Sequence, residues 1–187
     1  MDGIIRNTKV YPLLTMLIGL FSFLISGFIS GFFLSNGLLS IMLIGVFGNL
    51  LMLFVMGISD NLFIKIVWGV GGAIIAILLG FAIGEGVSWI FPSLASIIPN
   101  VVFFIVINTV FGVVQGISIY GRGSIKFFLP VSGLVSLVLG LIAETTNLMS
   151  GKFWAGIDLN LLVIVTSLGT TSGFCIGLYR SLKLKKG

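Results

Sequence analysis

Long apolar segments separated by short polar breaks are the dominant pattern along this chain of 187 residues. A hydrocarbon core about 30 Å thick needs about 20 apolar residues for each transmembrane helix. Six segments approach that length, and turn-forming clusters such as Ser35-Asn36-Gly37 and Ser59-Asp60-Asn61 separate them. The predicted spans cover residues 11–35, 38–58, 62–84, 97–120, 127–145 and 159–179.

These segments are expected to be helices because they are apolar on all sides. The strands of a transmembrane barrel alternate apolar and polar residues over only about 10 positions. A helix also satisfies its own backbone hydrogen bonds within lipid, which an open strand does not. We therefore predict an all-α polytopic membrane protein, with residues 1–187 forming a single transmembrane domain built as a six-helix bundle.

Composition supports this class, because 58% of the residues are hydrophobic and only 8% are charged. A soluble domain has about 25% charged residues, and a disordered chain combines low hydrophobicity with high charge, so both classes are excluded. The first segment is also longer than the apolar core of a secretory signal peptide, which is about 7–15 residues. We interpret it as the first span.

The basic residues predict the orientation. Six spans place both termini, the second–third loop and the fourth–fifth loop on one side of the membrane, with nine of the ten lysines and arginines. Lys152 alone lies on the other side. Basic residues concentrate in cytoplasmic loops, so both termini are expected in the cytoplasm, at a plasma or inner membrane. The basic tail, residues 180–187, is then expected to meet anionic lipid headgroups, and nucleic acid is not an expected partner.

A weak threefold repeat is present along the chain. Lys9, Lys65 and Lys126 each precede an odd-numbered span, and Val46-Phe47-Gly48 recurs as Val110-Phe111-Gly112. One interpretation is three repeated helical hairpins in parallel orientation. The other is that a shared topology places lysines at the inner ends of hairpins without any internal repetition.

Small residues recur at every fourth position in five of the spans, which keeps them on one helix face. Such faces let helix backbones approach closely in lipid. They predict either a tightly packed single bundle or an interface with another membrane subunit. The series are Ser22/Ser26/Ser30, Gly72/Ala76/Gly80/Gly84, Gly112/Gly116, Ser132/Ser136/Gly140 and Gly169/Gly173/Gly177.

Polar residues within the spans are candidate functional groups, because such residues are costly in lipid. Asn108 and Gln115 share one face of the fourth span, Asn49 lies in the second, and hydroxyl residues gather at 166–172 in the sixth. They could form hydrogen bonds between helices or line a path or pocket for a solute.

The remaining candidates lie at the predicted outer ends of the spans. Glu85 follows Lys65 by 20 residues, which is about 30 Å of helix, and Glu144 occupies the equivalent place in the fifth span. Trp89 and Trp154 lie nearby in the sequence. These residues are either an interfacial belt with solvated carboxylates or an outward-facing pocket for a cationic or aromatic solute.

Most catalytic chemistry is not expected. The chain has no histidine and one cysteine, Cys175, so no metal site, cofactor or catalytic residue is predicted and the protein is not expected to be an enzyme. Gly69-Val70-Gly71-Gly72 lacks the spacing of a dinucleotide-binding motif.

The leading hypothesis is an integral membrane transport component for a small solute, a substrate-binding or permease subunit with an outward-facing pocket. The alternatives are a non-transporting accessory or assembly subunit of a membrane complex, or a small channel. In size, six-span topology and cytoplasmic termini the chain resembles the substrate-capture subunits of energy-coupling-factor importers, without a shared motif. The resemblance implies ATPase partner subunits, because no nucleotide-binding signature is present. The predicted substrate-binding residues are Glu85, Trp89, Asn108, Gln115, Glu144 and Trp154.

Overall fold

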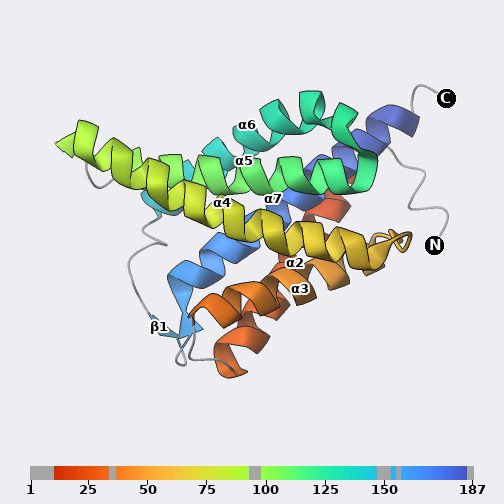
Figure 1. Ribbon diagram of the computed structural model, residues 1–187, viewed down its shortest axis with the longest axis horizontal. Coiled ribbons are helices and arrows are strands. Elements are labelled where there is room, and N and C mark those ends of the chain that lie inside the picture. The colour runs from red at the N-terminus through yellow and green to blue at the C-terminus, as the bar shows by residue number, and fades with distance from the viewer. Residues whose placement is uncertain (1–10, 34–36, 93–97, 147–152, 155–156, 185–187) are drawn as a thin grey trace.

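The computed structural model describes residues 11–33, 37–92, 98–146, 153–154 and 157–184 (Figure 1). These residues form six α-helices, a single turn of 3₁₀-helix and a pair of two-residue strands. The helices are α2 (Tyr11–Phe33), α3 (Gly37–Val55), α4 (Leu62–Ile90), α5 (Ile98–Tyr120), α6 (Ile125–Thr145) and α7 (Leu159–Leu184). The short elements are η2 (Arg122–Ser124), β1 (Phe153–Trp154) and β2 (Ile157–Asp158), and β1 pairs with β2 in antiparallel orientation.

The predicted all-α membrane bundle is confirmed. Five of the six helices in the described chain are long and apolar enough to cross a membrane. The remaining helix, α3, has 19 residues. The burial of its side chains is described only for Leu43–Val55, an apolar stretch that is shorter than a membrane span. These segments form helices because lipid offers no hydrogen-bond partner to an unpaired backbone group, and a helix pairs its own backbone groups.

Two helices run beyond their predicted ends. Helix α4 continues from Gly84 to Ile90 and projects past its neighbours (Figure 1). Charged and polar residues near Glu85 do not by themselves end a helix, whereas Pro92 disfavours helical backbone at the residue before it. The helix accordingly ends just before Phe91, which has a non-helical φ of −125°. Helix α7 likewise continues past Tyr179 to Leu184.

The helices pack mainly as sequential neighbours, with one long-range exception. Helix α5 lies between α4 and α6, and α3 packs against both α2 and α4. Helix α7 packs along α2, although the two are at opposite ends of the chain, and also contacts α5 and α6. The first two predicted hairpins, α2–α3 and α4–α5, are therefore close pairs, whereas α6 and α7 have their main partners outside the third hairpin.

The small-residue series form contacts within the chain itself. Gly19 of α2 and Gly169 of α7 meet backbone to backbone, and a Cβ at Gly173 would collide with the carbonyl oxygen of Thr15. A Cβ at Gly80 of α4 would lie 3.0 Å from the Phe103 ring of α5. Lipid supplies no hydrophobic drive between helices, so close backbone approach is what holds such helices together.

One end of the bundle carries all three tyrosines of the chain, and we call it the tyrosine end. Tyr11 begins α2, Tyr120 ends α5, and Tyr179 lies in the last turns of α7. This end lies toward the right of Figure 1, where α7 ends and α4 begins. Its turns use left-handed backbone at Gly57 (φ +68°) and Gly121 (φ +81°), which glycine adopts without strain.

Candidate functional site

A buried polar network occupies the middle of the bundle around Asn108 of α5. Asn108 Nδ2 donates to the Phe104 carbonyl oxygen at 3.0 Å and to Ser167 Oγ of α7 at 3.1 Å. Thr171 Oγ1, also of α7, donates to Asn108 Oδ1 at 3.4 Å. Asn108 and Thr171 have no exposed surface. The sequence identified Asn108 and the hydroxyl residues near 170 separately, and the structure brings them together.

Gln115, two turns further along α5, joins a second polar pair. Its Nε2 donates to Asn49 Oδ1 of α3 in a short hydrogen bond, and Asn49 Nδ2 donates to the Gly45 carbonyl oxygen at 2.7 Å. Both amide side chains are completely buried. Gly69 of α4 makes room for them, because a Cβ at that position would lie 2.8 Å from Gln115 Nε2 and would collide with Asn49.

The two pairs lie on one face of α5. Residues seven positions apart in a helix return to nearly the same side, and Gly112 lies between Asn108 and Gln115. A Cβ at Gly112 would lie 2.9 Å from Ser132 Cβ of α6 and 3.9 Å from Thr171 Cγ2 of α7. Helix α5 thus directs Asn108 toward α7 and Gln115 toward α3 from the centre of the bundle.

Three buried side-chain polar atoms of α5 and α7 lack a hydrogen-bond partner in the described chain. They are Gln115 Oε1, Ser172 Oγ and Thr109 Oγ1. Buried polar groups are paired in more than about 90% of cases. The Gln115 oxygen is the most informative of the three, because its own amide nitrogen is engaged by Asn49 while the oxygen has spare capacity to accept.

The predicted outer residues are less closely associated. Glu144, at the end of α6, accepts a hydrogen bond from Asn100 Nδ2 of α5 at 3.1 Å. Glu85 is exposed on α4, and Trp89, one turn further, is 86% exposed. No hydrogen bond or ring contact joins these two to Glu144 in the part of the chain that the structure describes. Trp154 lies in β1, and the position of its side chain is outside the described part.

An arginine that the sequence assigned to the basic tail instead points back into the bundle. Arg180 Nε donates to Tyr120 Oη at 3.1 Å, and its Nη1 donates to Tyr11 Oη and to the Met56 carbonyl oxygen, both at 3.0 Å. These bonds join the ends of α3, α5 and α7 to the start of α2. One feature of the sequence could have revealed this cluster. All three tyrosines lie at the predicted cytoplasmic ends of spans.

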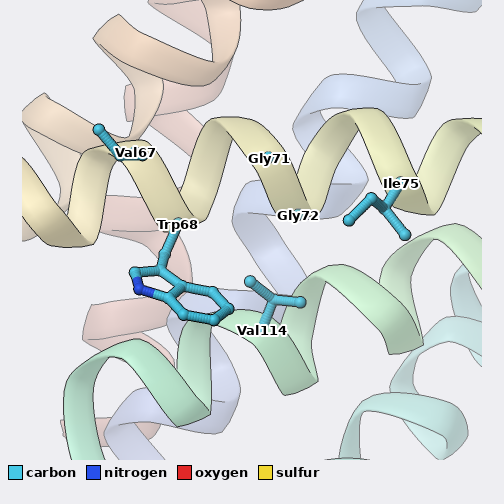
Figure 2. Close-up of a pocket in the computed structure, with 6 residues that line it drawn as sticks. All are labelled: Val67, Trp68, Gly71, Gly72, Ile75 and Val114. Atoms are coloured by element: carbon cyan, nitrogen blue, oxygen red, sulfur yellow. The ribbon is translucent and has the colours of Figure 1, made fainter.

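A separate apolar groove lies on the outer surface between α4 and α5. Figure 2 shows Trp68 reaching from α4 toward α5, with its ring beside Val114. The groove encloses about 230 Å³ and is lined by Val67, Trp68, Gly71, Gly72, Ile75 and Val114. Its lining offers almost no polar group, so it differs in chemistry from the predicted solute pocket.

The described residues contain no group of three or more His, Cys, Asp or Glu side chains placed to hold a metal ion. Comparison with protein-family models, curated proteins and solved structures found no significant match to the chain.

Proposed function

We propose that this protein is an integral membrane transport component that binds a small polar solute at the polar centre of its bundle. The observation that supports this most is Gln115 Oε1, a fully buried amide oxygen with no partner in the described chain. Polar groups at membrane depth are costly and commonly mark a substrate or ion path. A solute donor reaching this oxygen would satisfy it.

The chemistry of the centre favours a solute recognised by hydrogen bonds. Its described polar side chains are amides and hydroxyls, which both donate and accept. Asn108 lies ten residues from the start of α5, about 15 Å along the helix, which is near the middle of a hydrocarbon core about 30 Å thick. The solute would therefore bind deep in the membrane rather than at its surface.

Entry is proposed from the end opposite the tyrosines. Glu85, Trp89, Glu144 and Trp154 would line an outward-facing vestibule there, with the carboxylates raising the local concentration of solutes that carry positive charge. The hydrogen bond from Asn100 holds Glu144 at that end of the bundle. The tyrosine end is proposed to face the cytoplasm of a plasma or inner membrane, because the basic residues gather on that side.

The packing of the small-residue series favours the transport component over the accessory subunit. An accessory subunit requires small-residue faces that are free for another membrane protein, yet the series in α2, α4, α5, α6 and α7 face neighbours in the same chain. Partner subunits stay part of the transport proposal, since ATP-driven uptake would need an ATPase that this chain does not contain.

Co-purified solute provides the first test. The protein would be purified in mild detergent, and bound small molecules and proteins would be identified by mass spectrometry. The compound found would then be measured for saturable binding and for uptake into proteoliposomes. Gln115→Met and Asn108→Leu are expected to weaken binding at least tenfold, and Glu85→Ala or Trp154→Ala to slow uptake.

A matched control is Ser136→Ala, which also removes a buried polar group. The Ser136 hydroxyl donates to the Ser132 carbonyl oxygen of its own helix, so binding is expected to stay unchanged. Unchanged binding in both Gln115→Met and Asn108→Leu would overturn the proposal. A stable protein partner without any bound solute would favour the accessory subunit, and single-channel conductance in planar bilayers would favour the channel.

A further inference from the structure

Arg180 is held at the tyrosine end by three neutral oxygen acceptors, the hydroxyls of Tyr11 and Tyr120 and the carbonyl of Met56. A guanidinium has five N–H donors, and these bonds use Nε and Nη1 only. Nη2 donates to no residue in the described chain. It is also not one of the three buried polar atoms that lack a partner, so it is open to a ligand from outside the bundle.

A second cation lies one turn away on the same helix. Lys183 Nζ is 5.0 Å from the centroid of the Tyr179 ring and 6.0 Å from that of Tyr120. Tyr120 therefore contacts both cations, with its hydroxyl accepting from Arg180 and its ring lying beneath Lys183. Like charges three positions apart on a helix repel each other, and neither of these contacts neutralises a charge.

In the described chain, the partners of Arg180 and Lys183 include no carboxylate. The chain has five acidic side chains; Glu85, Glu144 and Asp158 are at the opposite end of the bundle, and Asp2 lies outside the described residues. Asp60 lies in the α3–α4 turn, and its backbone oxygen, not its carboxylate, accepts from Lys65 Nζ at 2.5 Å. Among the described residues, the tyrosine end thus carries more positive than negative charge, and aromatic side chains hold two of its cations.

We propose that Arg180 Nη2 and Lys183 Nζ together bind a phosphate group, supplied by an anionic phospholipid or as free inorganic phosphate. Phosphate oxygens suit the paired donors of a guanidinium, and an ammonium adds a point charge. Tyrosine side chains concentrate at the depth of lipid headgroups, which places the two cations at the level of lipid phosphates. A bound phosphate would relieve the repulsion between them and stabilise the four helix ends that Arg180 joins.

The test measures the melting temperature of the purified protein with three additives. Short-chain phosphatidylglycerol and inorganic phosphate supply the anion, and short-chain phosphatidylcholine is the zwitterionic control. A melting temperature that rises with phosphatidylglycerol but not with inorganic phosphate identifies the lipid as the source of the phosphate. A melting temperature that rises with both additives identifies a general phosphate site. Native mass spectrometry is expected to show one retained phosphatidylglycerol when the lipid is the source.

Variants test whether Arg180 and Lys183 are responsible for the rise in melting temperature. Lys183→Gln is expected to reduce the rise by at least half, whereas Lys126→Gln, which removes an exposed lysine at the same end, leaves it unchanged. Arg180→Gln is expected to abolish the rise, and if this variant fails to fold, Lys183→Gln alone decides. Absence of any rise with both anions, or an equal loss in Lys126→Gln and Lys183→Gln, would overturn the proposal.

Discussion

Gly19 and Gly169 meet backbone to backbone where α2 crosses α7, and a Cβ on either residue would collide with the carbonyl oxygen of the other. The contact joins α2 to α7, the first and last helices of the described chain. It depends on both residues lacking a side chain, since the colliding atoms are main-chain atoms that no rotamer change can move away.

Gly169→Ala is therefore expected to destabilise the protein by about 1–3 kcal/mol or more, the range for overpacking a buried contact. Gly71→Ala is the matched control, because nothing lies within 4 Å of its added Cβ. Alanine is favoured over glycine within a helix by roughly 0.5–1 kcal/mol, so that variant should melt at the same temperature or slightly higher. Thermal melting in detergent compares them, and equal melting temperatures would contradict the close crossing.

The hydrogen bond between Gln115 and Asn49 predicts a positive coupling between their variants. Gln115→Met and Asn49→Leu each remove one partner and leave the other buried without its bond, which costs about 1–3 kcal/mol. The double variant leaves neither amide, so its loss of stability should be smaller than the sum of the single losses. A double-mutant cycle on melting temperature or denaturant unfolding measures this, and strict additivity would show that the two side chains do not interact.

A substitution at Gly80 distinguishes two roles for the small-residue face of α4, which are packing within the chain and docking of a partner protein. Gly80→Leu is expected to unfold or strongly destabilise the bundle, because its side chain would meet Ile107 and Phe103 of α5. Gly86→Leu, on the same helix with open space around it, should fold normally. Size-exclusion profiles and melting curves provide the readout. A Gly80→Leu protein of normal stability that had lost a co-purifying membrane protein would instead restore the accessory-subunit hypothesis.

Orientation can be tested by cysteine labelling in a Cys175→Ala background, which removes the native thiol. Gly123→Cys and Gly86→Cys place single cysteines at opposite ends of the bundle, at exposed glycines with open space. In intact cells a membrane-impermeant maleimide is expected to label Gly86→Cys, and to label Gly123→Cys only after permeabilisation. The reverse pattern would place the tyrosine end outside.

The bounds of the helices show where sequence reasoning succeeded and where it failed. The start of α4 at Leu62 and the end of α5 at Tyr120 agree with the predicted spans, because glycine, asparagine and charged residues mark those turns. Helices α4 and α7 extend past the ends of their predicted spans, Gly84 and Tyr179, to Ile90 and Leu184. In both cases polar residues were interpreted as helix ends, although helix continues into the interface until a proline or the loss of contacts stops it.

The candidate site also has features that the sequence indicated and features that only the structure showed. Asn108 and Gln115 stand out in the sequence because amides are rare in an apolar span, but their partners do not. Asn49 could equally have bonded to its own helix alone, and Arg180 could have stayed in a solvated tail. Glu85 and Trp89 keep only their predicted position at the end of α4, without a described contact that builds a pocket around them.

The sequence alone determined that this is an all-α bundle of apolar, membrane-type helices and which residues gather at each end. Those properties follow from apolar length and from the absence of backbone partners in lipid. Only the tertiary structure decided which helix meets which. Helices that are apolar on all sides have no preferred face in lipid, so the choice of neighbour depends on backbone fit at glycines and on a few buried polar pairs. Both require two distant segments to be seen together, as Gly19 and Gly169 are.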